Sequence, residues 1–373
     1  MNRLELAGCK LAICLGPGGV GKTTISAALA IDGACNGRAV DVMTVDPAPR
    51  LLDALGLNAD ASEPREVALD SIALAAGAAR RGRLRALRLD PRSTFDAIVR
   101  RYAATPAAAE AIISGRIYAN LASAFAGVAD YMAMEKLLEL AAEPTADFIV
   151  LDTPPAAEAL DFLDAPRRLL ELLGSRAVSL LGTRQGRFGS GVVDLAARAV
   201  LSAFDRVTGL KLLGDVQAFV RNFEGMYEGF AERASRARAM LHAESTAVIV
   251  VTTAEAGRIA QAGEFIAALR KAELRVRAVI VNRAMADLPN VAEISRAKMP
   301  AALKRKLKRN LADYAALKTR EAISFETLRA AMPAGAALML SSELEHEPRT
   351  LADLAQIGAR IHRGQEPMPL RSE

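Results

Sequence analysis

The sequence ICLGPGGVGKTTISAALA at residues 13–30 decides the fold of this chain. Residues 16–23, GPGGVGKT, fit the spacing G-x-x-x-x-G-K-[ST] of a phosphate-binding loop. Glycines in such a loop let successive backbone N–H groups converge on phosphate oxygens, and the helix that follows directs its positive N-terminal end at the same anion. An apolar run precedes the loop at residues 10–15, and a helical pattern follows it at residues 22–35. This strand–loop–helix order predicts a nucleotide-binding α/β domain.

The residues of the loop have predicted contacts with a magnesium-bound nucleoside triphosphate. Lys22 is expected to reach the β- and γ-phosphates, and the Thr23 hydroxyl is expected to ligate Mg²⁺. Thr24 is expected at the α-phosphate. The backbone around the phosphates is expected to come from Gly16, Gly18, Gly19, Val20 and Gly21.

Further apolar runs alternate with helical patterns along the chain. These runs lie at residues 38–45, 84–89, 147–151, 246–252, 275–281 and 336–340, and a closing helix is expected at residues 351–361. Strands that are apolar on both faces and separated by helices indicate a mostly parallel sheet with helices on both sides. The predicted fold class is therefore α/β.

Helix-rich stretches interrupt this core. The core is assigned to residues 1–92, 143–162 and 244–373, and the helical insertions to residues 93–142 and 163–243. A further helical segment is expected at residues 287–332 within the last part of the core. We find no internal repeat, so a tandem duplication of the nucleotide domain is excluded.

Two carboxylates follow predicted strands. Asp46 comes directly after VMTV, and Asp152 comes directly after FIVL. Because ligands of open parallel sheets bind beyond the carboxyl ends of the strands, both side chains are expected to point toward the phosphates of the loop. Asp152 is expected to hold Mg²⁺ through water, and Asp46 to orient or deprotonate the attacking water. With Lys22, they form the predicted catalytic set.

Composition argues against several other classes of function and site. Aromatic residues make up 4% of the chain and Trp is absent, which argues against a base-stacking nucleic-acid surface. The three cysteines, Cys9, Cys14 and Cys35, form no CxxC pair, so neither zinc nor a disulfide framework is expected. With no signal-peptide pattern and no apolar run of about 18 residues, the expected location is the cytosol.

Six stretches together resemble the arsenical-pump ATPase family, which includes the guided-entry ATPases that deliver tail-anchored membrane proteins. GPGGVGKTT resembles the family's deviant phosphate-binding loop. The other five are TVDPAPRLLDALG at 44–56, LRLDP at 87–91, ADYMAMEKLLEL at 129–140, DTPPAAEALDFLDAP at 152–166 and VIVNR at 279–283. The resemblance implies that the nucleotide is ATP, that Asn282 reads adenine, and that the chain works as a dimer with two nucleotides near the interface.

The sequence departs from the family pattern at Pro17. The family usually has G-K-G-G-V-G-K-[ST], and its first lysine crosses to the nucleotide of the other subunit. Proline carries neither charge nor an N–H donor, so Pro17 cannot take that role. By analogy with arginine fingers, a missing cation of this kind costs roughly 10³- to 10⁵-fold in rate. We therefore hypothesise a heterodimer with a paralogue that keeps the lysine, with a homodimer as the other arrangement. No cysteines match the arsenite-binding or zinc-binding ones of the family, so neither ligand is expected.

Two alternatives remain beside a client-targeting ATPase. One is a partition or positioning ATPase, although that class is usually shorter and lacks large helical insertions. The other is a regulatory subunit that binds ATP and hardly hydrolyses it.

Two apolar stripes in the insertions fit either hydrophobic membrane-protein clients or internal packing. One contains Tyr131, Met134, Leu137 and Leu138, and the other contains Phe219, Phe223, Met226, Tyr227 and Phe230. The basic run KRKLKRN at residues 304–310 fits either a solvated helix face or contact with an acidic surface, which is that of a lipid membrane or of a partner.

Overall fold

The computed structural model describes residues 6, 8–58, 61–69, 82–115, 118, 126–154, 156–173, 226–285 and 291–363. The chain forms two compact units. The sheet unit comprises Met1–Arg88, Glu143–Leu160 and His242–Glu373, and the helical unit comprises Leu89–Ala142 and Asp161–Leu241.

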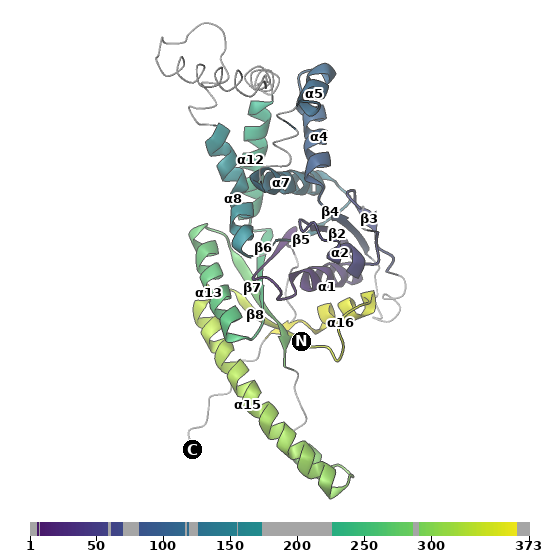
Figure 1. The fold of residues 1–373 in the computed structure, drawn as a ribbon, viewed down its shortest axis with the longest axis vertical. Helices are drawn as coiled ribbons and strands as arrows, with labels where there is room; N and C mark the ends of the chain where they lie inside the picture. The colour runs from purple at the N-terminus through teal and green to yellow at the C-terminus, as the bar shows by residue number, and fades with distance from the viewer. Residues whose placement is uncertain are drawn as a thin grey trace, which may run out of the picture. The chain divides into compact units, whose positions relative to one another are not determined.

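Nine described strands form one sheet in the order β3-β4-β2-β5-β1-β6-β7-β8-β9 (Figure 1). Their bounds are β1 Leu11–Leu15, β2 Ala39–Thr44, β3 Arg65–Glu66, β4 Arg83–Arg88, β5 Phe148–Asp152, β6 Thr246–Thr252, β7 Val276–Ala284, β8 Ala337–Ser342 and β9 His362–Arg363. Neighbouring strands run parallel, except that the edge strands β3 and β9 pair antiparallel with β4 and β8. The predicted α/β fold with a mostly parallel sheet is confirmed.

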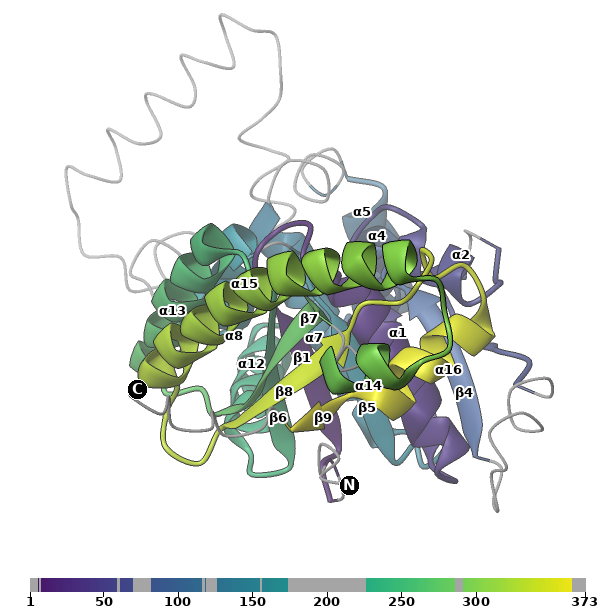
Figure 2. The ribbon, with the colours of Figure 1, turned by 90° about the horizontal axis from the view of Figure 1, so that it is seen from below.

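The central strands are continuous apolar runs because helices cover both faces of the sheet. Every residue of β1, β5 and β6 is buried. Helices α1 (Lys22–Cys35) and α16 (Leu351–Arg360) pack together over one face, whereas α13 (Ala256–Lys271) covers β6 and β7 on the other and contacts α15 (Ala301–Ala331) (Figure 2). This unit also contains two shorter helices, α2 (Arg50–Ala54) and α14 (Val291–Arg296), and the first residues of α8 (Ala156–Leu173), up to Leu160.

A charged pair interrupts the apolar pattern of β2. Asp41 is buried and lies opposite Arg85 of β4 in the ladder. Arg85 donates two hydrogen bonds to the Asp41 carboxylate, Nε to Oδ1 at 2.7 Å and Nη2 to Oδ2 at 2.6 Å. Because both carboxylate oxygens are satisfied by one guanidinium, the strand tolerates a buried acid.

The helical unit is built from α4 (Pro91–Tyr102), α5 (Pro106–Ile113), α7 (Ala126–Ala142), α12 (Tyr227–His242) and the part of α8 (Ala156–Leu173) from Asp161 onward. Helix α4 begins at Asp90, whose side chain accepts from the backbone N–H groups of Arg92 and Ser93. An acidic N-cap followed by proline is a strong helix start, so the Asp90-Pro91 pair begins a helix two residues after the end of β4.

The two apolar stripes are packing faces wherever the structure describes them. Tyr131 and Met134 of α7 are buried, as are Met226 and Phe230 at the start of α12. The Phe230 ring lies 6.0 Å from that of Tyr131 and 6.3 Å from that of Phe95. Phe219, Phe223 and the side chain of Tyr227 lie outside the described residues. Leu137 is buried too, whereas Leu138 is half-buried and lines a cavity. The buried members of both stripes therefore stabilise the helical unit.

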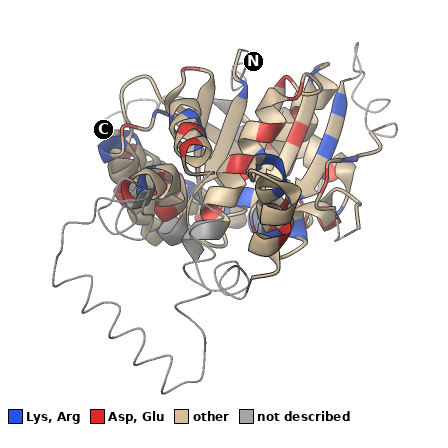
Figure 3. Ribbon diagram, turned by 90° about the horizontal axis from the view of Figure 1, so that it is seen from above, with Lys and Arg blue, Asp and Glu red and all other residues tan. Residues whose placement is uncertain are grey.

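Acidic and basic residues are interspersed along the strand and helix ribbons rather than separated by sign (Figure 3). No described helix is both long enough and apolar enough to cross a membrane.

Candidate functional site

The loop of residues 16–23 joins β1 to α1 at the carboxyl edge of the sheet, as the sequence predicts. At two of its positions only glycine fits, because atoms of other strands lie where a Cβ would be. A Cβ on Gly16 would lie 2.1 Å from the carbonyl oxygen of Val251 in β6. Gly21 has φ +89°, and a Cβ there would lie 2.3 Å from Nδ2 of Asn282. The neighbouring strands therefore hold the loop at both ends.

Lys22 is the first residue of α1 and its ammonium is held by the loop itself. Nζ donates to the carbonyl oxygens of Gly16 and Pro17, each at 3.0 Å. Burial lowers the pKa of Lys22, and the negative charges of Asp152 and Asp46 act in the opposite direction. The lysine is thus a desolvated cation at the loop, next to two carboxylates.

Asp152 is the centre of a buried hydrogen-bond cluster. Thr23 Oγ1 and Thr44 Oγ1 donate to its Oδ2 at 2.9 and 3.1 Å, and Ser26 Oγ donates to its Oδ1 at 3.3 Å. Burial raises the pKa of the Asp152 carboxyl to about 6, although the hydrogen bonds from the three hydroxyls and the charge of Lys22 favour the ionised form. The carboxyl is therefore held in one place by hydroxyl groups from two elements, α1 and β2.

Ser26 and Thr44 are members of this cluster that the sequence analysis missed. Ser26 lies one turn after Lys22, so its position on the loop-facing side of α1 is readable from helical spacing. Thr44 lies beside Asp152 only because β2 is the neighbour of β5, with Thr44 and Asp152 in register. No local sequence signal gives that strand order.

The donor set around Asp152 fits Mg²⁺. The donors are one carboxylate and hydroxyl oxygens, which suit a hard cation, and Mg²⁺ is usually held by one or two carboxylates together with substrate phosphates. Among the described residues, no group of three or more His, Cys, Asp or Glu side chains forms an all-protein metal cage. Thr23 and Asp152 are the residues that would hold the ion.

Asp46 lies just beyond β2 and shapes the backbone there. Its Oδ1 accepts from the backbone N–H of Ala48 at 2.9 Å, and its own N–H donates to Thr44 Oγ1 at 3.2 Å. The first contact is that of a turn-forming aspartate. Asp46 is nevertheless close enough to Lys22 for its charge to raise the pKa of the lysine.

Asn282 supports the loop from β7. Its Nδ2 donates to the carbonyl oxygen of Val20 at 2.9 Å, and the side chain is buried. With Gly21 packed against the same amide nitrogen, Asn282 fixes the loop backbone between Val20 and Gly21. Thr24 follows Thr23 in α1 and is half-buried.

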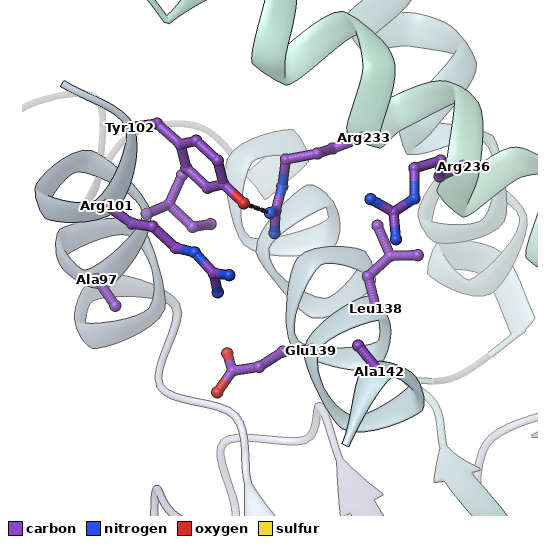
Figure 4. A pocket seen from close by; sticks show the side chains of 9 residues that line it. Ala97, Arg101, Tyr102, Leu138, Glu139, Ala142, Arg233 and Arg236 are labelled. Carbon is purple, nitrogen blue, oxygen red and sulfur yellow. Dashed lines mark hydrogen bonds between the residues drawn. The ribbon is translucent and has the colours of Figure 1, made fainter. Parts of the chain in front are cut away.

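A separate cavity of about 210 Å³ lies within the helical unit (Figure 4). Its lining residues are Ala97, Ile98, Arg101, Tyr102, Leu138, Glu139, Ala142, Arg233 and Arg236. Arg233 crosses it, with hydrogen bonds to the Tyr102 hydroxyl and to the buried Glu135 carboxylate. Its lining combines three guanidinium groups and one carboxylate with the apolar side chains of Ala97, Ile98 and Leu138.

Comparison with known proteins agrees with this geometry. The model of the anion-transporting ATPase family matches residues 9–318, which include the loop, Asp152 and Asn282. The chain belongs to the anion-transporting ATPase family. It is therefore an ATPase, as the sequence analysis expects, and the resemblance stated there is confirmed.

Curated relatives of this ATPase are distant. The chain is 24% identical to ATPase get3 of Schizosaccharomyces pombe over 78% of its own length and 77% of that protein. It is 28% identical to ATPase GET3 of Mycosarcoma maydis over 51% of its length and 54% of that protein. It is 27% identical to ATPase GET3 of Malassezia globosa over 46% of its length and 47% of that protein. The chain thus spans about half the length of the latter two relatives.

Proposed function

We propose that this ATPase hydrolyses Mg²⁺-bound ATP at the loop of residues 16–23, with Lys22, Asp46 and Asp152 as catalytic residues. The observation that supports this most is the convergence of Thr23, Ser26 and Thr44 on the buried Asp152 carboxylate beside Lys22.

In this proposal the backbone of residues 16–21 and Lys22 bind the phosphates, Thr24 lies at the α-phosphate, and Asp46 orients the attacking water. Thr23 and Asp152 hold Mg²⁺, which when bound neutralises charge on the β- and γ-phosphate oxygens. Asn282 reads adenine through Oδ1 or through the N–H of Nδ2 that is not bonded to Val20.

Isothermal titration calorimetry with Mg·ATP tests the site. The wild-type chain is expected to bind, whereas Lys22→Ala is expected to lose most of the affinity because the phosphates lose their cation. The control is Lys308→Ala, an exposed lysine on α15. Absence of binding by the wild type, or equal binding by Lys22→Ala, contradicts the proposed site.

We further propose that the chain acts as a dimer whose nucleotide state controls binding of hydrophobic membrane-protein clients. The resemblance to guided-entry ATPases and the relatives named GET3 support this. Co-purification with a membrane-anchor helix, with and without Mg·ATP, tests it. Because Met226 and Phe230 are core residues, the informative variant is Phe219→Ser with Phe223→Ser, provided that the melting temperature is unchanged.

The partner in this dimer is proposed to be a paralogue with lysine at the position of Pro17. The Pro17 residue is buried and its carbonyl oxygen binds Lys22 within the same chain. Brisk hydrolysis by the isolated chain would rule out dependence on a partner lysine. Binding of ATP without hydrolysis, with or without any partner, would instead favour the regulatory-subunit alternative.

Contact with an anionic membrane surface is proposed for the first part of α15, which runs beyond the strands of the sheet unit (Figure 1). Residues 301–320 carry seven Lys or Arg and one Asp, and Leu303 and Leu317 are 44% and 50% exposed. A basic helix with exposed leucines binds acidic headgroups. Co-sedimentation with phosphatidylglycerol vesicles, but not with phosphatidylcholine vesicles, is expected, and equal sedimentation with both contradicts the proposal.

A further inference from the structure

Arg258 lies beside the phosphate-binding loop, although it is 236 positions from Lys22 in the sequence. It is in the first turn of α13, which begins just after β6. Its Nη2 lies 3.9 Å from the position of a Cβ built on Gly19, the exposed residue at the turn of the loop. The guanidinium therefore lies beside Gly19, at the distance of van der Waals contact from a methyl group placed there.

The position of Arg258 relative to the loop is fixed by the sheet. Strand β6 is the parallel neighbour of β1, and Gly16 packs directly on the carbonyl of Val251 near the end of β6. Beyond that end, Thr252 Oγ1 donates to the carbonyl oxygen of Arg258 at 3.2 Å. The first turn of α13 and the loop thus both contact the end of β6.

The charge of Arg258 has no counter-ion in the described part of the chain. Its Nη1 donates to the neutral side chain of Gln261 at 3.1 Å, and no carboxylate among the described residues forms an ion pair with it. A cation without a counter-ion is stabilised when an anion binds beside it.

We propose that Arg258 contacts the terminal phosphate of ATP bound in the same subunit and supplies part of the positive charge that Pro17 cannot. This inference rests on the proposed binding of Mg·ATP at the loop. A guanidinium is planar, permanently charged and able to donate two parallel hydrogen bonds to phosphate oxygens. In a loose phosphoryl-transfer transition state, negative charge spreads over the oxygens of the transferred group, and a fixed cation beside them lowers the barrier.

The proposal differs from the partner-lysine hypothesis in the origin of the cation. A partner lysine acts only in a dimer, whereas Arg258 belongs to the same chain as the loop. The two cations are compatible, but the contact by Arg258 exists in the isolated chain and is measurable there.

The test compares Arg258→Gln with the wild type as isolated full-length chains in Mg²⁺ buffer. Calorimetric Kd values for ATP, a non-hydrolysable ATP analogue and ADP are measured, together with single-turnover hydrolysis. Arg258→Gln is expected to weaken ATP and analogue binding at least tenfold and to change ADP binding less than twofold. Hydrolysis in a single turnover is expected to fall by roughly 10²-fold or more. Arg258→Lys is expected to be intermediate, because it keeps the charge and loses the bidentate geometry.

The matched control is Arg270→Gln, an exposed arginine in the last turn of the same helix, which is expected to behave like the wild type. Equal loss of ATP and ADP affinity, or no loss, overturns the terminal-phosphate contact while leaving the nucleotide site in place. A wild-type chain that binds neither nucleotide overturns the proposed function and this inference together.

Discussion

Thr23 and Asp152, which are 129 positions apart in the sequence, are joined by a hydrogen bond of 2.9 Å from the threonine hydroxyl to the aspartate carboxylate. The bond connects the first turn of α1 to the end of β5, so the two residues proposed to hold Mg²⁺ are already adjacent without ligand. Such preorganisation reduces the rearrangement needed when Mg·ATP binds.

Replacing Asp152 by Asn is expected to reduce Mg²⁺-dependent ATP hydrolysis by roughly 10²- to 10³-fold, because the negative charge that holds the ion is lost. Steady-state phosphate release over a Mg²⁺ titration measures this, either alone or with any lysine-bearing partner. Asp313→Asn, an exposed acid on α15, is the control. Unchanged Mg²⁺ dependence in Asp152→Asn contradicts the assignment.

The raised pKa of Asp152 gives the ligand-free protein a specific pH dependence. The folded pKa is about 6, whereas an unperturbed aspartate titrates near pH 3.9. Between these values the folded chain binds more protons than the unfolded chain, so this residue makes the free energy of unfolding decrease as pH rises. The free energy of unfolding of the wild type minus that of Asp152→Asn is expected to fall by on the order of 2 kcal/mol from pH 4 to pH 6.5.

Urea unfolding at several pH values, without nucleotide and without Mg²⁺, measures that difference. A difference that is constant over the range shows that the carboxyl is already ionised at pH 4. The sign expected here is opposite to that of a salt-bridged surface carboxylate.

Gly21 and Asn282 are expected to be energetically coupled. Gly21→Ala places a methyl group 2.3 Å from Asn282 Nδ2 at a backbone φ of +89°, so strong destabilisation and loss of ATP binding are expected. Asn282→Ala removes the bond to Val20 and is expected to cost about 1 kcal/mol. In the double variant the steric clash disappears, so the combined cost is expected to be at least about 0.5 kcal/mol smaller than the sum. Strict additivity would show that the two side chains do not meet.

The buried Glu135–Arg233 pair is expected to stabilise the helical unit. Glu135 also accepts from the hydroxyl of Tyr131, and burial beside Glu135 raises the pKa of that tyrosine, so it remains a donor. Arg233→Ala leaves the Glu135 charge buried without its cation and is expected to cost about 3–5 kcal/mol. Arg236 is exposed and lies three residues after Arg233 in α12. Arg236→Ala is expected to change the free energy of unfolding by less than about 0.5 kcal/mol. Thermal unfolding by circular dichroism compares the two, and similar melting temperatures would contradict a structural role for the pair.

The start of α16 depends on a capping box. The Thr350 side chain accepts from the backbone N–H of Asp353, and the Asp353 carboxylate accepts from the backbone N–H of Thr350. Thr350→Ala is expected to lower the free energy of unfolding by about 1 kcal/mol. Thr319→Ala on the exposed side of α15 serves as the comparison. Chemical denaturation at neutral pH measures both, and equal values would show that the cap is not stabilising.

Much of the nucleotide site was predictable because its signals are local. The spacing of residues 16–23 specifies glycines, a lysine and a threonine at one strand–helix junction, and the structure has that junction. Asp46 and Asp152 were placed at strand ends because apolar runs stop immediately before them. The position of Ser26 on the loop-facing side of α1 could be read from helical spacing, but Ser26 belongs to no motif that singles it out.

The apolar stripes show the limit of such patterns. An amphipathic helix presents an apolar face whether that face meets a core or a ligand, so periodicity alone left Tyr131 and Met226 open to both interpretations. Burial in the folded helical unit assigns these two residues to packing.

The sequence by itself determined the phosphate-binding loop, the alternation of strands and helices, and the absence of the signature lysine at Pro17. These depend on backbone conformation and on residue type, both of which are encoded within a few consecutive positions. Only the tertiary structure decided that Thr44 supports Asp152, that Asn282 holds the loop backbone, and that Arg258 lies beside Gly19. Those contacts depend on which strands are neighbours in the sheet, and that order results from the packing of the whole domain.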